Sequence, residues 1–145
     1  MKAYADSSFI VALYLPQQSS PKAIAFMERY AQALPFIPWH RLEIRNAIRL
    51  AVRQQVIDVT QGKTQLRQPD ADLKEGALLV HTPIDWIDVL REAEKLGAVH
   101  NVAIGCRSAD LFHVAAAREL GCDTFLTFDD KQTAMAKAAG LTVKP

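Results

Sequence analysis

The stretch from Arg107 to Lys131 most constrains the fold of this chain, because it has the pattern of a helix followed at once by a short buried strand. A serine opens the helix as N-cap, and Asp110 follows in the first turn, where a carboxylate faces the positive end of the helix. Apolar residues then recur at helical spacing up to a glycine, a common residue at helix C-termini. Residues 124–128 are rich in β-formers and predict a buried strand. Asp129 and Asp130 follow that strand directly.

A further carboxylate, Asp6, has the same position relative to a strand. The apolar segment 2–5 predicts a strand, and residues 7–15 predict a helix that ends at a proline. Ligands of open α/β sheets bind beyond the carboxyl ends of parallel strands, so Asp6, Asp110 and Asp129 are expected at one rim of the sheet. Taken alone, Asp6 fits a helix cap as well as it fits a functional acid.

The remaining segments alternate between helical and strand patterns. Periodicity, caps and breaks predict helices over 21–33, 41–56, 58–75, 83–96 and 132–139, and strands over 35–39, 76–81 and 141–143. Pro69 is expected to end or kink the helix over 58–75, Gly97 to stop the next helix, and residues 101–106 to form a loop or short turn. This alternation predicts one α/β domain over residues 1–145, with helices on both faces of a mostly parallel sheet.

Composition excludes several classes of protein. The chain has 145 residues and a formal net charge of +1, so any surface that binds nucleic acid must be local. Cys106 and Cys122 form no Cys-x-x-Cys pair and have no matching histidine pair, which disfavours a zinc site. The N-terminal apolar run is interrupted at Asp6, and no apolar run is long enough to span a bilayer. These features predict a cytoplasmic protein with free thiols.

The helix predicted over 41–56 carries both an acid and a row of bases. Glu43 lies in its first turn, and arginines recur every four residues along another face, at Arg41, Arg45, Arg49 and Arg53. Like charges in such a row disfavour the helix slightly, which indicates a partner that offers phosphates or acidic side chains. A solvated arginine face explains the pattern equally well.

Four acids are therefore expected together at one rim of the sheet: Asp6, Glu43, Asp110 and Asp129. Carboxylates packed together oppose folding unless positive charge neutralises them. Mg²⁺ takes one or two carboxylates together with water and substrate phosphate, and such a cation promotes displacement at phosphorus. The four acids thus indicate metal-dependent chemistry on a phosphate ester.

Four short motifs resemble those of PIN-domain ribonucleases, in the same order and at similar spacing. They are Ala5-Asp6-Ser7-Ser8, Leu42-Glu43-Ile44-Arg45-Asn46-Ala47, Ser108-Ala109-Asp110-Leu111-Phe112-His113 with the alanine-rich turn after it, and Leu126-Thr127-Phe128-Asp129. The chain length is similar to that of the VapC-like toxins of bacterial toxin–antitoxin pairs. The resemblance implies a three-layer αβα PIN-like domain, Mg²⁺- or Mn²⁺-dependent hydrolysis of RNA phosphodiester bonds, a cognate antitoxin and a homodimer.

Carried over by position, the resemblance gives four catalytic acids, Asp6, Glu43, Asp110 and Asp129, of which the metal ligands are Asp6, Asp110 and Asp129. Ser8 and Thr127 match polar positions that support the site. Asp130 doubles the last acid, so the fourth position is open between Asp129 and Asp130. His113 fits either a phosphate contact or packing against the sheet. The basic candidates for binding RNA or a protein partner are Arg41, Arg45, Arg49 and Arg107.

Two other classes of protein fit the pattern less completely. A catalytically inactive PIN-fold module that binds protein or RNA would have the same fold with a vestigial acidic rim. A receiver-type phosphoacceptor domain also places an acidic pocket on an α/β sheet. It needs a strand-end aspartate in mid-chain and a strand-end lysine, and neither is well placed here. The metal-dependent ribonuclease is the preferred hypothesis.

Overall fold

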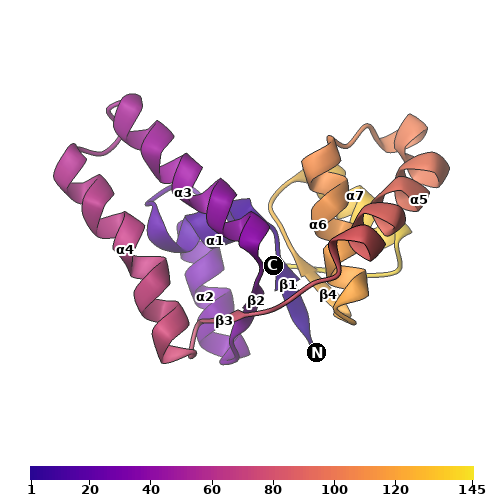
Figure 1. Ribbon diagram of the computed structural model, residues 1–145, viewed down its shortest axis with the longest axis horizontal. Coiled ribbons are helices and arrows are strands. Elements are labelled where there is room, and N and C mark those ends of the chain that lie inside the picture. Colours follow the sequence, from indigo (N-terminus) through magenta and orange to yellow (C-terminus); the bar gives the residue numbers. More distant parts are fainter. The chain divides into compact units, whose positions relative to one another are not determined.

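The computed structural model describes every residue from Met1 to Pro145. Helices alternate with short strands, and all strand pairings are parallel, as the sequence predicts (Figure 1). The chain forms two compact units: unit 1 contains Met1–Asp6 and Pro83–Pro145, and unit 2 contains Ser7–Thr82. None of the helices combines the length and the apolar character needed to cross a bilayer.

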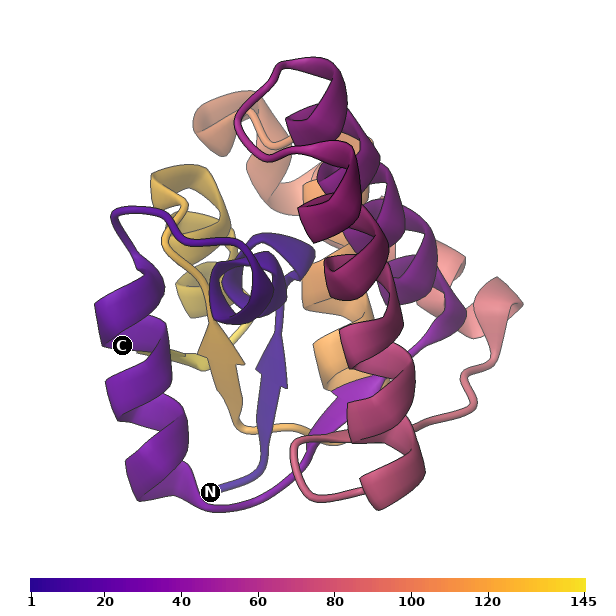
Figure 2. The ribbon, with the colours of Figure 1, turned by 90° about the vertical axis from the view of Figure 1, so that its left-hand side faces the viewer.

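Unit 1 contains a parallel sheet in the order β1-β4-β5, with the bounds β1 (Ala3–Ala5), β4 (Thr124–Leu126) and β5 (Thr142–Lys144). Ala5 lies opposite Leu126, so the carboxyl ends of β1 and β4 coincide, and Figure 2 shows the two strands side by side and pointing the same way. The helices of this unit are α5 (Trp86–Ile104), α6 (Ser108–Glu119) and α7 (Asp130–Ala138). Helices α6 and α7 contact the sheet, and α5 packs on both of them.

The interior of unit 1 explains this arrangement. Tyr4 and Phe125 are fully buried and stack with ring centroids 6.0 Å apart, which joins β1 to β4. The run Val114–Ala117 of α6 is also fully buried, and its small side chains let the helix lie close to the strands. His113 is buried beside this run, with Nδ1 2.9 Å from the hydroxyl oxygen of Tyr4. Of the two interpretations of His113, the structure shows packing against the sheet.

Unit 2 has a two-stranded parallel sheet, in which Leu34 of β2 lies opposite Leu79 of β3. Its elements are α1 (Ser7–Tyr14), α2 (Ser20–Tyr30), β2 (Leu34–Phe36), α3 (Pro38–Arg53), α4 (Val59–Glu75) and β3 (Leu79–His81). Helix α1 packs on α2 and α3 through buried residues that include Phe9, Phe26 and Ile44. The hydroxyl of Tyr14 at the end of α1 donates to Asp72 Oδ2 of α4 at 2.6 Å.

Helices α3 and α4 form a hairpin, and α4 runs through Pro69 without ending there, contrary to one of the two predicted outcomes. Proline has no N–H and so withdraws one hydrogen bond from the helix. Contacts with α3 hold this part of α4: Arg41 pairs with Asp70, and Arg45 Nη1 donates to the Leu66 carbonyl oxygen at 2.9 Å. Gly62 allows the two helices to approach, because a Cβ there would clash with Val52 Cγ2.

The predicted boundaries are wrong in unit 1 mainly at α5. This helix begins after Asp85, which caps the amides of the first turn, and runs through Gly97 to Ile104, so most of the predicted loop 101–106 is helical. A glycine costs about 1 kcal/mol inside a helix. Here α5 packs closely on α6, and a Cβ at Gly97 would lie only 3.3 Å from Leu111 Cδ1. The helix ends instead at Gly105, where φ is +76°.

Other elements differ by a few residues. The strands predicted over 35–39, 76–81 and 124–128 each contain only three residues, and α3 begins at Pro38 rather than Arg41. Proline is favoured at the first position of a helix, where its missing N–H has no partner to lose. Glu43 consequently lies beyond the first turn of α3, and Asp129 lies in the connection from β4 to α7 rather than directly after the strand.

Candidate functional site

Asp6 lies immediately after β1 and is the most deeply buried of the predicted acids, with 1% of its surface exposed. Its backbone N–H donates to the Leu126 carbonyl oxygen at 3.0 Å, which extends the β1–β4 pairing by one residue. Asp6 Oδ2 accepts two side-chain hydrogen bonds of 2.8 Å each, from Thr127 Oγ1 and from Gln132 Nε2. The connection from β4 to α7 therefore holds this carboxylate in place.

Asp129 is the N-cap of α7, and it also forms hydrogen bonds with Thr127 and Gln132. Its Oδ1 accepts the backbone N–H of Gln132 at 2.7 Å, and its own backbone N–H donates to Thr127 Oγ1 at 3.0 Å. Thr127 thus donates to Asp6 and accepts from Asp129, which links the two acids. Asp129 and Asp130, the first residue of α7, are both exposed, so hydrogen bonding and not burial distinguishes Asp129. The structure therefore joins Asp129 to the network around Asp6.

Asp110 is half-buried in the first turn of α6, where its Oδ2 accepts the backbone N–H of Arg107 at 3.2 Å. Burial and the negative charges of Asp110 and Asp129 raise the pKa of the nearby Cys106 thiol to about 11. Both carboxylates therefore lie close enough to Cys106 to act on it. The thiol donates to the Lys131 carbonyl oxygen at 3.3 Å, which ties the start of α6 to the start of α7. We refer to Asp6, Asp110 and Asp129, with Thr127 and Gln132, as the candidate site.

The other predicted site residues belong to unit 2, apart from Arg107. Glu43 is half-buried on α3, and Ser8 is exposed in the first turn of α1. Both lie in Ser7–Thr82, whereas every residue of the candidate site lies in unit 1. Arg107 is exposed at the start of α6.

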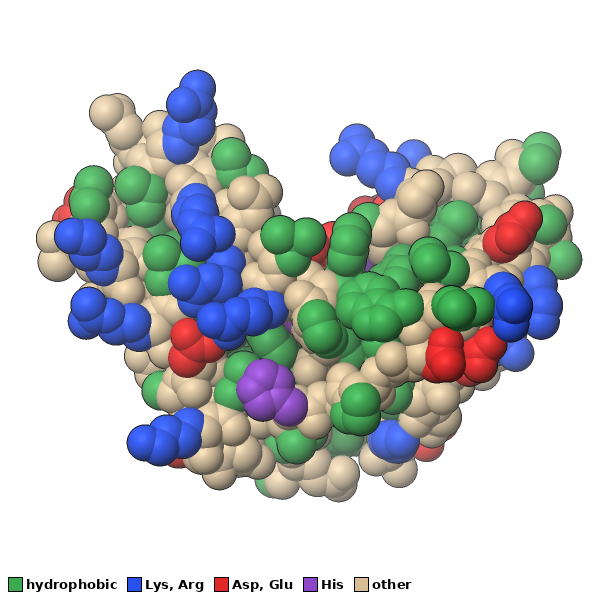
Figure 3. Space-filling view, viewed as in Figure 1, with side chains coloured by type: hydrophobic (Ala, Val, Ile, Leu, Met, Phe, Trp, Pro, Cys, Tyr) green, Lys and Arg blue, Asp and Glu red, His purple; other side chains and the backbone are tan.

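The arginine row of α3 divides into two parts. Arg41 and Arg45 are engaged with α4, since both pair with Asp70 and Arg45 also binds the Leu66 carbonyl. Only 26% of the Arg45 side chain is exposed, so the solvated arginine face, one of the two alternatives, does not extend to this position. Arg49 and Arg53 are exposed, and Lys and Arg side chains gather over this part of unit 2 in Figure 3. These two arginines are the part of the row that is open to a partner.

The chemistry of the donors at the candidate site suits a hard divalent cation. No group of three or more His, Cys, Asp or Glu side chains is already arranged around a metal position. Mg²⁺ requires only one or two carboxylates, because water and substrate phosphate complete its coordination. The side-chain atoms of the candidate site that can bind a cation are all oxygens. One of them, Gln132 Oε1, is buried without a hydrogen-bond partner. A buried carbonyl oxygen left in this state is one that a cation or its water could satisfy.

Sequence reasoning did not single out Gln132. A signal for it was present, because Asp129-x-x-Gln132 has the spacing of a capping box, in which the last residue of the box can bind back toward the cap. The contact with Asp6 has no such signal, because Asp6 and Gln132 are 126 positions apart.

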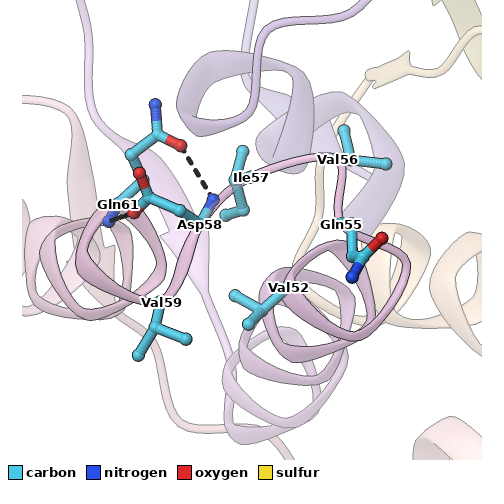
Figure 4. A pocket seen from close by; sticks show the side chains of 7 residues that line it. All are labelled: Val52, Gln55, Val56, Ile57, Asp58, Val59 and Gln61. Atoms are coloured by element: carbon cyan, nitrogen blue, oxygen red, sulfur yellow. Dashed lines mark hydrogen bonds between the residues drawn. The ribbon is translucent and has the colours of Figure 1, made fainter.

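A separate pocket opens where α3 turns into α4 (Figure 4). Its volume is about 510 Å³, and it is lined by Val52, Gln55, Val56, Ile57, Asp58, Val59 and Gln61. None of the predicted site residues lines this pocket. Asp58 is its only charged side chain, and its Oδ1 is engaged in capping α4. The pocket therefore offers no evident catalytic chemistry.

The fold is α/β with parallel strands, and three acids lie beyond strand ends or in first helical turns on one unit. The model of the PIN domain family matches residues 3–138. The chain belongs to the PIN domain family, and the predicted fold class, a three-layer αβα PIN domain, is confirmed. A comparison with curated proteins finds no match.

Three solved structures have the same fold over nearly the whole chain. VapC20 from Mycobacterium tuberculosis, a Sarcin-Ricin loop cleaving toxin, is 17% identical with a TM-score of 0.67, and the alignment covers 99% of this chain and 100% of that one. FitAcB from Neisseria gonorrhoeae is 15% identical with a TM-score of 0.65, covering 99% and 96%. FitAB bound to an IR36 DNA fragment is 18% identical with a TM-score of 0.67, covering 98% and 93%.

Proposed function

We propose that this chain is an endoribonuclease that hydrolyses RNA phosphodiester bonds with the help of Mg²⁺ or Mn²⁺, and that it is the toxin of a toxin–antitoxin pair. One observation carries the proposal: the buried carboxylate of Asp6 is fixed at the end of β1 by Thr127 and Gln132, next to Asp129. A carboxylate that is both buried and oriented is typical of a ligand or general base rather than of a solvated helix cap. Membership of the PIN family and the likeness to VapC20 support this function.

In this proposal, Asp6, Asp110 and Asp129 hold the cation, and Glu43 completes the catalytic set. When bound, the cation supplies positive charge at the scissile phosphate and activates a water molecule. Thr127 and Gln132 keep the Asp6 carboxylate in one orientation, and Ser8 supports the site from the start of α1. Exposed Arg49 and Arg107 contact RNA phosphates or the antitoxin, and Arg41 and Arg45, which also pair with Asp70, are the remaining basic candidates.

The proposal also covers assembly and location. Both units act as one PIN domain over residues 1–145, and the alignment with VapC20 covers 99% of this chain. The protein functions in the cytoplasm as a homodimer and is held inactive by a cognate antitoxin. FitAB has been solved bound to a DNA fragment. In our proposal, this chain likewise joins a partner that binds nucleic acid.

Cleavage of RNA by the purified chain tests the proposal. We expect cleavage with Mg²⁺ or Mn²⁺, none in EDTA, and none from the Asp6→Asn variant. Asp85→Asn is the matched control, because Asp85 caps α5 outside the candidate site and asparagine also caps helices. Cleavage that continues undiminished in EDTA, or in Asp6→Asn, would contradict the proposal.

The second candidate is a catalytically inactive PIN module that binds RNA or protein. The observation in its favour is that no three metal-binding side chains are arranged around one position, and that the Asp6 carboxylate is already hydrogen-bonded. Binding of RNA without cleavage at any concentration of Mg²⁺ or Mn²⁺ would support this candidate.

A further inference from the structure

We propose that the side-chain carbonyl oxygen of Gln132, Oε1, is a ligand of the divalent cation at the candidate site. The inference rests on the proposed function, and it adds a neutral oxygen donor to the predicted acids. Gln132 contacts Asp6 and has no role among the sequence predictions.

Gln132 is held between two of the acids. Only 5% of its surface is exposed. Its Nε2 donates to Asp6 Oδ2 at 2.8 Å, and its backbone N–H donates to Asp129 Oδ1 at 2.7 Å. Because the nitrogen and oxygen of a carboxamide are separated by about 2.3 Å, Oε1 lies no more than about 5 Å from Asp6 Oδ2.

The orientation of this carboxamide is fixed by its contact with Asp6. Nε2 faces Asp6 Oδ2, as expected beside an ionised carboxylate, which only accepts hydrogen bonds. Oε1 then points to a different partner, yet it is buried and accepts no hydrogen bond from the protein. Buried polar atoms in folded proteins nearly always have a partner, which makes this atom an exception that requires an explanation.

The other side chains of the candidate site cannot supply a donor to this oxygen. The Thr127 hydroxyl has one hydrogen, which it donates to Asp6, and carboxylates have none. We infer that the partner of Oε1 is a group from outside the chain. Amide oxygens are ordinary ligands of hard cations, and the nearby negative charges of Asp6 and Asp129 favour a cation over neutral water.

A second Asp-x-x-Gln capping box in the same chain shows what is unusual here. At the start of α4, Gln61 Oε1 accepts the backbone N–H of Asp58 at 2.8 Å, while Asp58 Oδ1 accepts from Gln61 N at 2.7 Å (Figure 4). At the start of α7, the backbone N–H of Asp129 binds Thr127 instead. The oxygen of Gln132 therefore does not accept the N–H of its N-cap residue, and the amide nitrogen donates to Asp6.

The test measures Mn²⁺ binding without RNA, by electron paramagnetic resonance of the free ion, together with thermal melting in EDTA. Gln132→Met keeps a long unbranched side chain and removes the oxygen. We expect its affinity for Mn²⁺ to fall about tenfold or more, because both the oxygen and the Nε2 contact with Asp6 are lost. Gln132→Glu, described below, also lacks the Nε2 contact but keeps an oxygen, so it separates the two effects. Gln61→Met is the matched control, because it removes the same side chain from a box whose oxygen is satisfied, and its affinity should equal that of the wild type.

A second variant keeps the inference testable if Gln132→Met does not fold. Gln132→Glu replaces the neutral oxygen by a carboxylate, so it should bind Mn²⁺ at least as tightly as the wild type, although it melts lower in EDTA beside Asp6. Weaker binding by Gln132→Glu would overturn the inference. Unchanged affinity in folded Gln132→Met would also overturn it, while cleavage by the wild type would leave the proposed function standing. A wild type that neither binds Mn²⁺ nor cleaves RNA would contradict both.

Discussion

Thr127 and Asp6 are joined by a 2.8 Å hydrogen bond between residues 121 positions apart, and the same hydroxyl oxygen accepts the backbone N–H of Asp129. A threonine just after β4 thus orients one acid and anchors the start of the helix that carries another. Its hydroxyl is buried, so neither contact can be replaced easily by water.

Thr127→Val tests this link, because valine keeps the shape and removes the hydroxyl. We expect the free energy of unfolding to fall by about 1–3 kcal/mol, since the Asp129 N–H and one bond to Asp6 lose their partner. Chemical denaturation measures the change. Thr142→Val, at an exposed position of β5, is the control and should change stability by no more than about 0.5 kcal/mol. Equal effects at the two positions would contradict the structural role of Thr127.

Asp110→Asn separates capping from charge. As a first-turn carboxylate, Asp110 gains about 0.3–1 kcal/mol from the helix end. Two carboxylates about 4 Å apart near a protein surface repel by about 4 kcal/mol, and the repulsion exceeds the helix term even when the spacing is looser. Asparagine can still accept the Arg107 N–H. We therefore expect the variant to melt at or above the wild type in EDTA, and to lose most of the stabilisation that Mg²⁺ gives the wild type. A variant that melts well below the wild type in EDTA would identify Asp110 as a structural cap.

Arg45→Ala and Arg49→Ala should act on different properties. Arg45 Nη1 binds the Leu66 carbonyl from a half-buried position, so its removal should lower the free energy of unfolding by about 1–2 kcal/mol. Arg49 is exposed, and its removal should change stability by no more than about 0.5 kcal/mol. Binding of RNA should weaken in Arg49→Ala, with a salt dependence reduced by about one counterion. Unchanged binding of both RNA and antitoxin would make Arg49 a solvated residue only.

The two thiols should be unreactive in the folded protein at neutral pH. Burial raises the pKa of Cys106 and of Cys122 to about 11, from about 9, with the negative charges of Asp110 and Asp129 contributing at Cys106. A raised pKa favours the neutral thiol in the folded state, so this contribution to stability is complete below pH 9 and is lost as the pH rises through 11. Reaction rates with a disulfide reagent across this range, in native and denatured protein, measure the effect, and single Cys→Ala variants assign it. Rapid native reaction at pH 8 would contradict the assignment.

The homodimer is expected to use apolar residues on α2 and α3. Ile24, Leu42 and Leu50 are exposed there, and burial of such side chains drives association. Sedimentation should show a dimer at micromolar concentration, and Leu42→Lys with Leu50→Lys should give a folded monomer. Val102→Lys on α5, where the side chain is fully exposed, is the control. A wild type that sediments as a monomer would count against the dimer.

Local patterns gave reliable information about which elements form, and less about where they end. The strand before Asp6 and the helix that carries Asp110 are present because apolar periodicity and caps act over a few residues. Gly97 did not end α5, since close packing against Leu111 compensates for a glycine inside the helix. In the same way, α4 continues through Pro69 because Arg41 and Arg45 hold it from α3.

For the candidate site, local patterns predict Asp6, Asp110 and Asp129 and their order, because each follows a strand or lies at the start of a helix. Which side chains hold Asp6 depends on the tertiary fold. The parallel pairing of β1 with β4 brings Thr127 and Gln132 to it across 121 and 126 positions, and no local pattern encodes contacts at that separation. The same pairing leaves Gln132 Oε1 buried with no protein partner, a property that exists only once the chain has folded around it.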